Sequence, residues 1–375
     1  MKIGIDIRTI NKPKSGVGYY VTNLIRKFQE IDQDNQYLLI SNNGAYEQEF
    51  RNLPNFEHCA THVSNENHVI GDLWESFYLP NFLDRKKVNV FHGPAFMIPL
   101  RQASTRLVVT IHDIVAYQRP KTVPLKYAMY MRLLIRMVAR RAHRIITPSQ
   151  STKNDLIERL GVDEGKITVI YEAVSPFFVP PPPGASFEAI KRKFGVRDRY
   201  ILFTGNLEPR KNLARVMRAF DLARKKLGGR YQLVICGKKG WLYRDIIEAF
   251  ERLKGDNDIV LTNYVTEDEL LQLYQGADMF LFPTLYEGFG LPVLEAMGCG
   301  VPVITSNISS LPEIAGGAAL LVNPLDEEEI AAAIGRLAGD AALARELREK
   351  GLRRAACFSW TDTARQTLEV YRSVL

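Results

Sequence analysis

The sequence predicts an α/β fold made of two Rossmann-like domains, each a doubly wound parallel sheet, that face each other across a cleft. Three observations lead to this prediction. Short apolar strand patterns alternate with helical patterns along the chain. A run of four prolines at 180–183 interrupts the alternation, which then restarts. A length of 375 residues is too great for one ordinary domain and suits two.

The first half reads as alternating strands and helices. Strands are expected at 2–8, 36–41, 88–93, 106–113, 144–149 and 166–171. Residues 20–28 carry apolar side chains at helical spacing, and a second helix is expected from a cap at Ser149 or Ser151 through Leu160. This alternation favours a parallel sheet, so residues 1–178 are the expected N-terminal domain.

The second half repeats the pattern. Consecutive prolines can neither join a sheet interior nor continue a helix, so residues 179–186 are the expected linker to a domain at 187–358. Strands are expected at 199–205, 232–237, 258–261, 277–282, 301–305 and 319–322. Helices are expected at 212–226, 242–253, 266–274, 291–297, 326–337 and 341–358.

Charge and cysteine content restrict the partners and the compartment. Residues 1–174 carry 23 Lys and Arg against 17 Asp and Glu, whereas residues 175–375 carry 26 against 25. The basic first half suits an anionic partner such as a membrane surface. No aromatic–basic interleaving or zinc-finger spacing points to nucleic acid. There is no apolar run long enough to span a membrane and no signal-peptide pattern, and the four cysteines lie far apart, so we expect a cytoplasmic protein.

The stretch at 283–302 predicts an anion site. A buried strand ends at Pro283, Gly288 and Gly290 form a loop, and a helix follows with a proline in its first turn. Free amides and the positive end of the helix dipole favour an anion there. Two carboxylates, Glu287 and Glu295, flank the loop. Carboxylates do not bind phosphate, but they accept hydrogen bonds from sugar hydroxyls.

A second cluster follows the strand at 199–205. Gly205 and Asn206 open a turn that presents Arg210 and Lys211 just before a helix. Adjacent cations at this position suit a diphosphate, although a solvated helix start is the alternative.

Two features of the first half face the expected cleft. Gly16, Val17 and Gly18 precede a helix, but the third glycine of a dinucleotide fingerprint is absent. A loop over a ligand explains the glycines better, and a simple turn into the helix is the alternative. His112 ends an apolar strand, which is compatible with a functional or a structural histidine.

Two patterns remain open to more than one interpretation. His58, Cys59 and His62 have metal-compatible spacing without further ligands, so zinc is not favoured. Arginines recur every four residues, at Arg132, Arg136, Arg140 and Arg144, and the apolar residues expected on the opposite face of the helix are Leu133, Leu134, Met137 and Val138. This helix either lies on an anionic membrane or packs on the core with a solvated basic face.

With these motifs, the chain resembles the retaining GT-B glycosyltransferases of family 4, also called glycosyl transferases group 1, and within them the O-antigen mannosyltransferases. The motifs in the second half are GNLEPRKN, GKKGW, LYEGFGLPVLEAMGCGVPVITSNISSLPE and the terminal FSW. Those in the first half are SGVGYY, TIHD and TPSQ.

The resemblance implies roles for individual residues. Glu287 contacts the hydroxyls of the donor sugar, Glu295 takes the ribose hydroxyls, and Lys211 stabilises the leaving diphosphate. Many relatives carry an arginine where Asn206 stands, and Arg210 is expected to take over the role of that arginine and assist Lys211. The other implied contacts are His112 beside the transferring sugar, glycines 16 and 18 over the diphosphate, amides of Phe289, Gly290 and Leu291 on the diphosphate, and backbone near Val265 at the base. A C-terminal helix at about 359–375 packs back on the first domain.

The expected function is therefore transfer of a hexose to a lipid-linked or oligosaccharide acceptor, with mannose from GDP-mannose as the leading donor. The expected localisation is cytoplasmic, on the inner face of the cell membrane. The nucleotide sugar is a co-substrate, and no cofactor or metal is expected. The alternatives are a UDP-sugar transferase, a sugar-nucleotide epimerase or phosphorylase, and a non-catalytic nucleotide-sugar-binding protein.

Overall fold

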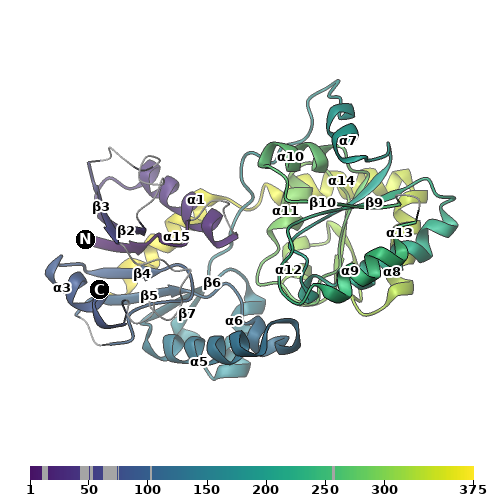
Figure 1. Ribbon diagram of the computed structural model, residues 1–375. Coiled ribbons are helices and arrows are strands. Elements are labelled where there is room, and N and C mark those ends of the chain that lie inside the picture. Colours follow the sequence, from purple (N-terminus) through teal and green to yellow (C-terminus); the bar gives the residue numbers. More distant parts are fainter. Residues whose placement is uncertain are drawn as a thin grey trace. The chain divides into compact units, whose positions relative to one another are not determined.

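The computed structural model describes residues 1–10, 16–42, 50, 54–61, 74, 76–101, 104–255 and 258–375 (Figure 1). It divides the chain into two compact units. Unit 1 comprises Met1–Ile114, Met129–Glu172 and Ser359–Leu375, and unit 2 comprises Val115–Ala128 and Ala173–Phe358.

Unit 1 is built on a parallel sheet whose described strands follow the order β3-β2-β1-β4-β5-β6-β7. The strands are β1 (Lys2–Asp6), β2 (Gln36–Asn42), β3 (Phe56–Thr61), β4 (Val90–Gly93), β5 (Arg106–Thr110), β6 (Arg144–Thr147) and β7 (Ile167–Val169). The chain order reverses between β1 and β4, as in a doubly wound sheet. The strand β3 is an addition to those expected from the sequence.

The helices of unit 1 are α1 (Gly16–Ile31), α3 (Leu79–Arg85), most of α5 (Leu125–Arg141), α6 (Gln150–Leu160) and α15 (Trp360–Ser373). The short helix α4 (Val115–Gln118) and the first turn of α5 belong to unit 2. The expected cap of α6 is Ser149, whose side chain accepts from the backbone N–H of Thr152. Helix α15 is tied to unit 1 by a buried hydrogen bond of 2.6 Å between Tyr371 Oη and His92 Nδ1. None of the described helices is long and apolar enough to cross a membrane.

Unit 2 contains a second parallel sheet, in the order β10-β9-β8-β11-β12-β13. The strands are β8 (Tyr200–Thr204), β9 (Gln232–Cys236), β10 (Ile259–Asn263), β11 (Met279–Phe282), β12 (Val303–Ser306) and β13 (Ala319–Val322). Strands β8, β9 and β11 are buried along their whole length, which is why they read as continuous apolar runs in the sequence. The prediction of two doubly wound parallel-sheet domains is therefore confirmed.

The helices of unit 2 are α7 (Glu188–Phe194), α8 (Leu213–Lys226), α9 (Arg244–Leu253), α10 (Glu267–Gln275), α11 (Leu291–Gly298), α12 (Leu311–Ala315), α13 (Glu327–Gly339) and α14 (Ala341–Ala355). The predicted capping box is present, because Thr266 and Glu269 each accept from the backbone N–H of the other. Helix α9 begins two residues later than expected, after Leu242, which has a left-handed φ of 52°.

The boundaries of the units differ from the expected domain boundaries in two places. The chain passes from unit 1 to unit 2 between Glu172 and Ala173, so the proline-rich stretch at 179–186 lies within unit 2. Residues 115–128 also belong to unit 2, although the first-half strands surround them in the sequence. Their apolar side chains pack there against residues that are far away in the chain, and no local pattern announces such contacts.

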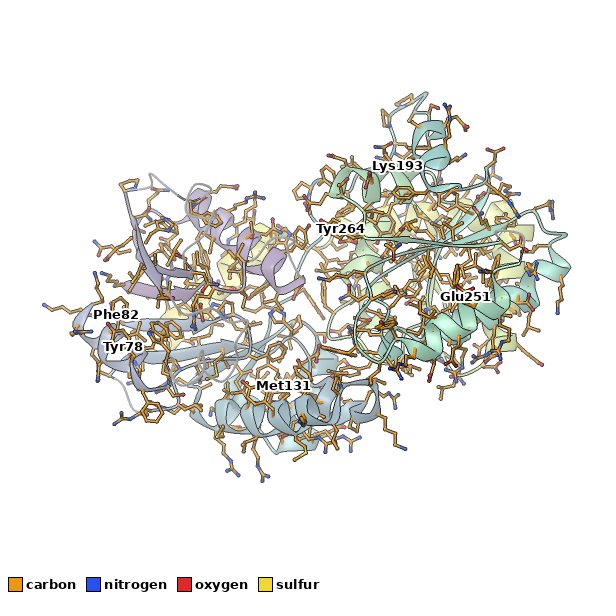
Figure 2. The ribbon with its side chains drawn as sticks, in the orientation of Figure 1. Tyr78, Phe82, Met131, Lys193, Glu251 and Tyr264 are labelled. Atoms are coloured by element: carbon orange, nitrogen blue, oxygen red, sulfur yellow. The ribbon has the colours of Figure 1, made fainter. Side chains whose placement is uncertain are left out.

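Helix α5 carries the arginines that recur every four residues. Its buried side includes Met131, labelled in Figure 2, with Leu134 and Val138. Four large apolar side chains of the same helix are instead exposed: Leu125 at 75%, Met129 at 63%, Leu133 at 60% and Met137 at 37%. The expectation that residues 133 and 137 lie opposite the arginines is therefore wrong, since they share the exposed face with Arg136 and Arg140.

Candidate functional site

The chain order of unit 2 reverses between β8 and β11, which pair side by side. In doubly wound sheets, ligands bind outside the carboxyl ends of the strands at such a switch point. The segments that leave these two strand ends are 205–212 and 283–290. They are the two segments in which the sequence places most of the ligand-binding residues.

Four charged side chains meet at this edge of the sheet. Lys211 Nζ donates to Glu287 Oε1 at 2.8 Å, and Arg210 Nη1 lies 2.7 Å from Glu287 Oε2. Arg210 Nη2 donates to Glu208 Oε1 at 2.8 Å. The side chains of Lys211 and Glu287 are each 9% exposed, so water screens their attraction only weakly. Two cations and two carboxylates thus balance each other in a compact cluster.

The cluster shifts the pKa values of its members. Burial lowers the pKa of Lys211, and Arg210 lowers it further, while Glu287 opposes both. Burial raises the pKa of Glu287, but the charges of Arg210 and Lys211 outweigh burial and lower it overall. An anion placed beside Lys211 would favour its charged form, so the site is built to gain from a negatively charged ligand.

Gly205 and Asn212 shape the path of the lysine. Gly205 has a φ of 140°, and a Cβ on it would lie 3.2 Å from Lys211 Cε. Asn212 adopts a left-handed conformation with a φ of 63°. Its side-chain amide donates to the carbonyl of Pro283 at 2.9 Å and to that of Pro324 at 2.7 Å. The turn after β8 is thereby fastened to the loop after β11, and Lys211 reaches Glu287.

Two serines hold the loop that carries Glu287. The backbone N–H of Glu287 donates to Ser309 Oγ at 3.0 Å, and this hydroxyl donates back to the carbonyl of Glu287. Ser310 Oγ lies 3.0 Å from the same carbonyl and 2.6 Å from that of Phe289. These contacts leave the loop little freedom, so the carboxylate is held in place by its backbone as well as by its cations.

Backbone amides are available at the start of α11. The N–H groups of Gly290 and Leu291 have no hydrogen-bond partner within the described ranges. Gly290 has a φ of 120°, and a Cβ there would lie 2.8 Å from Leu311 Cδ2, so only glycine fits. Pro292 follows in the first turn and has no N–H. These amides lie where the sequence predicts an anion site, and anion binding there stays a prediction.

Glu295 lies one turn into α11, and its carboxyl group is hydrogen-bonded to Tyr274. Tyr274 Oη donates to Glu295 Oε2 at 2.9 Å and lies 2.8 Å from Thr204 Oγ1. Burial raises the pKa of Glu295 to about 7, although the tyrosine hydrogen bond opposes the shift. A carboxyl group with this pKa exchanges its proton near neutral pH, and it can accept hydrogen bonds from ligand hydroxyls when ionised.

Residues 115–128 pack against the loop that carries Glu287. Val115, Val123 and Ala128 form a buried cluster with Tyr286, the neighbour of Glu287. The ring of Trp241 packs against that of Tyr127 in the same segment, with centroids 5.2 Å apart and the planes tilted by 38°. In addition, Arg119 Nε donates to the carbonyl of Leu285 at 3.3 Å. The first-half segment therefore supports the loop from within unit 2.

The predicted residues of unit 1 lie at the carboxyl edge of its own sheet. Gly16, Val17 and Gly18 form the first turn of α1, so the interpretation as a loop ahead of the helix is wrong. Ser15 lies outside the described residues. His112 follows β5, with Nδ1 3.0 Å from Glu172 Oε1 and Nε2 2.8 Å from the carbonyl of Pro94.

Two of the predicted site residues, Asn206 and Val265, are not part of the charged cluster. Asn206 is exposed, and Val265 is partly buried between β10 and the cap of α10. The residues that contribute to the site and were missed from the sequence include Glu208, Tyr274, Ser309 and Ser310. Glu208 stands two positions before Arg210 across a proline, which was a usable signal, whereas the others come from distant segments.

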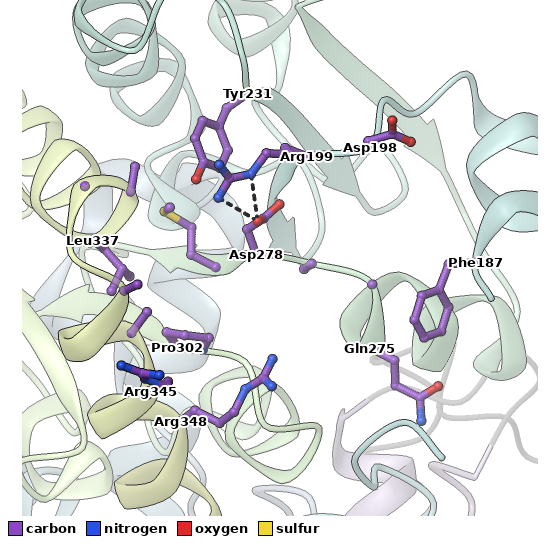
Figure 3. A pocket seen from close by; sticks show the side chains of 17 residues that line it. Phe187, Asp198, Arg199, Tyr231, Gln275, Asp278, Pro302, Leu337, Arg345 and Arg348 are labelled. Atoms are coloured by element: carbon purple, nitrogen blue, oxygen red, sulfur yellow. Dashed lines mark hydrogen bonds and ion pairs between the residues drawn. The ribbon is translucent and has the colours of Figure 1, made fainter. Parts of the chain in front are cut away.

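A cavity of about 560 Å³ lies at the opposite, amino edge of the unit 2 sheet. Figure 3 shows its lining, in which Arg199 pairs with Asp278 and Arg345 and Arg348 project from α14. None of the predicted ligand-binding residues lines it. Among the described residues, no group of His, Cys, Asp and Glu side chains could hold a metal ion. His62, part of the disfavoured zinc pattern, lies outside those residues.

Two family models match most of the chain. Residues 186–354 match the family "Glycosyl transferases group 1", and residues 14–176 match "Glycosyltransferase Family 4". The chain is 29% identical to the O-antigen chain mannosyltransferase B of Escherichia coli, over 99% of this chain and 100% of that protein.

Two further proteins illustrate the range of similarity. The serotype-specific mannosyltransferase WbdA of Escherichia coli is 32% identical over 74% of this chain, which covers only 35% of the longer protein. The solved structure of HepE from Anabaena, in complex with UDP-glucose, has a TM-score of 0.77 at 17% identity and covers 100% of both chains. Together with the fold, these matches show that the chain belongs to the GT-B glycosyltransferases of family 4.

Proposed function

We propose that this glycosyltransferase moves mannose from GDP-mannose, with retention of configuration, to a lipid-linked or oligosaccharide acceptor in the synthesis of a bacterial surface polysaccharide. The names of the relatives support the sugar and the polysaccharide. The observation that carries the proposal is the buried cluster of Lys211, Arg210 and Glu287 at the switch point of unit 2.

The chemistry of nucleotide-sugar transfer fits this cluster. When the diphosphate leaves, negative charge grows on it and positive charge grows on the sugar. Lys211, Arg210 and the positive end of α11 oppose the negative charge. These groups supply what a metal supplies elsewhere, so we propose a metal-independent reaction. The leaving phosphate can itself assist attack on the same face of the sugar, which retains the configuration without a protein nucleophile.

The ion pairs suggest how the donor is received. A diphosphate competes with Glu287 for Lys211 and Arg210 because it carries more negative charge. The carboxylate that it releases can then accept hydrogen bonds from the hydroxyls of the sugar. In this proposal Glu295 accepts from the ribose, while Gly16, Gly18 and His112 act from unit 1. The backbone near Val265 meets the base.

A panel of nucleotide sugars tests the proposal. The purified protein is incubated with GDP-mannose and with UDP-sugars, with and without a chelator, and with candidate glycan acceptors. The proposal expects turnover of GDP-mannose, no loss with chelator, and an α-linked product by NMR. Turnover of UDP-sugars alone would overturn the donor. Isomerisation of the nucleotide sugar, cleavage by phosphate, or binding without any turnover would support the epimerase, phosphorylase and non-catalytic alternatives respectively.

We further propose that the protein acts at the cytoplasmic membrane face through α5. Arg136 and Arg140 share the exposed face of this helix with Leu125, Met129 and Leu133. Large exposed apolar side chains next to arginines are typical of helices that lie in the interface of an anionic bilayer. This placement suits an enzyme whose acceptor is anchored in lipid.

A further inference from the structure

His112 is enclosed by hydrogen-bond acceptors on both sides of its ring. Nε2 faces the carbonyl of Pro94 at 2.8 Å, and a carbonyl can only accept. Nε2 must therefore carry a hydrogen. Nδ1 faces a carboxylate oxygen of Glu172 at 3.0 Å, which also accepts when ionised. A ring in which both nitrogens donate is an imidazolium.

The surroundings of this pair favour its charged form. The side chains of His112 and Glu172 are 12% and 5% exposed. Burial by itself lowers the pKa of His112, but Glu172, the Pro94 carbonyl and the neighbouring Asp113 outweigh burial and raise it. The other titratable groups nearby are His92 on β4 and Tyr20 on α1, whose ring meets the edge of the imidazole at 4.9 Å. Burial lowers the pKa of His92 to about 3, so His92 contributes no competing charge at neutral pH.

We propose that Glu172 is a positioning residue that holds His112 as a permanent imidazolium, so that the histidine acts on the donor as a fixed cation and not as a proton acceptor. The inference rests on the proposed function, in which His112 lies beside the donor. Because both N–H groups donate to acceptors of the protein, the ring can interact with a ligand through its positive charge and its carbon atoms. The positive charge favours the diphosphate of the donor and not its sugar, on which positive charge grows during transfer. The acceptor hydroxyl must then lose its proton to another group, such as the leaving phosphate.

The chain passes from unit 1 to unit 2 at two points. The first follows Ile114, two residues after His112, and the second follows Glu172 itself. The hydrogen bond between the two side chains thus joins both of these chain segments within unit 1. It orients the ring and fastens the segments at the same time.

Histidine NMR of the full-length protein tests the ionisation directly. The ring signals of His112, assigned by their loss in His112→Gln, are followed from pH 5 to 9. We expect both ring nitrogens to be protonated at pH 7 in the native protein, and the pKa of His112 to fall by at least one unit in Glu172→Gln. The matched control is Glu164→Gln, in which the exposed carboxylate of an ion pair with Lys153 is removed. A neutral His112 at pH 7, or an unchanged pKa in Glu172→Gln, would overturn the proposal.

A pH profile separates this role from a purely structural one. We expect kcat/KM of the native enzyme to be level from pH 6 to 8, and that of Glu172→Gln to fall at least tenfold across the same range. Glu172→Asp, which keeps the charge, is expected to restore part of the activity and a level profile. Equal losses at every pH would overturn the proposal. If no donor is turned over at all, the proposed function fails, while the NMR titration still decides the state of the ring.

Discussion

Lys211 and Glu287, 76 residues apart in the chain, form a buried hydrogen-bonded ion pair at 2.8 Å. The pair joins the turn after β8 to the loop after β11, and Arg210 closes it from the other side. A buried pair of this kind costs desolvation free energy and gives little net stability. Its presence at a switch point is therefore better explained by binding and catalysis than by stability.

Lys211→Ala is expected to lower kcat about 100-fold, because the leaving diphosphate loses its closest cation in a poorly solvated site. Glu287 stays paired with Arg210, so the fold should persist, and a thermal-unfolding measurement checks this. Lys254→Ala serves as the control, since this exposed lysine forms a surface ion pair with Glu251, away from the cluster. Transfer by Lys211→Ala at the native rate would contradict the role that we propose.

Glu295→Gln is expected to change the pH dependence of stability. The pKa of Glu295 is raised to about 7 in the folded state, against an ordinary value of about 4.3. The folded protein thus binds this proton more tightly than the unfolded chain. Stability contributed by the protonated group is complete below the unfolded pKa and is lost as pH rises towards 7.

The variant removes this titration. Its stability relative to the native protein should rise between pH 4.5 and 7, by at most about 3 kcal/mol, and then stay level. The amide oxygen of the glutamine can still accept the hydrogen bond from Tyr274, so this bond is kept in both proteins. Chemical unfolding at pH 5, 6, 7 and 8 measures the difference. A difference that does not change with pH would show that the carboxyl group titrates normally.

Local sequence patterns pointed to Arg210, Lys211 and Glu287, three of the four charged residues of the cluster, because each lies in a local motif. A strand, a glycine loop and a helix start follow one another around Glu287, and a strand and a turn precede Lys211. The carboxyl ends of parallel strands meet at one edge, which brings the two segments together. Fold class and the main charged residues were therefore within reach of the sequence.

The contacts that complete the site were out of reach for a physical reason. Ser309 and Ser310 contact the loop from 22 and 23 residues away, in a short segment with no periodic signal. Likewise, helical spacing shows that α5 has two faces but does not say which one the sheet covers. The exposure of Leu133 and Met137 depends on packing, which is decided by the whole unit.

Gly290→Ala is expected to destabilise the loop by about 2 kcal/mol, because alanine disfavours its positive φ and the new Cβ clashes with Leu311. Binding of the donor should weaken more than the fold does, since the displaced amides are those expected to meet the diphosphate. Gly335→Ala is the matched control. A Cβ at Gly335 meets nothing within 4 Å, and the residue lies inside α13, so alanine should stabilise by up to about 1 kcal/mol.

The exposed apolar side chains of α5 give the last prediction. Met129→Ser with Leu133→Ser is expected to lower partitioning onto vesicles of anionic lipid by on the order of tenfold, because two partly exposed side chains no longer enter the interface. Co-sedimentation at two salt concentrations measures it, and Arg136→Gln with Arg140→Gln should remove most of the salt dependence. Leu325→Ser, at a side chain that is also 60% exposed but lies in unit 2, is the control. Equal binding by the native protein and both α5 variants would show that this helix does not contact the membrane. The arginines and apolar residues of α5 would then be a solvated surface.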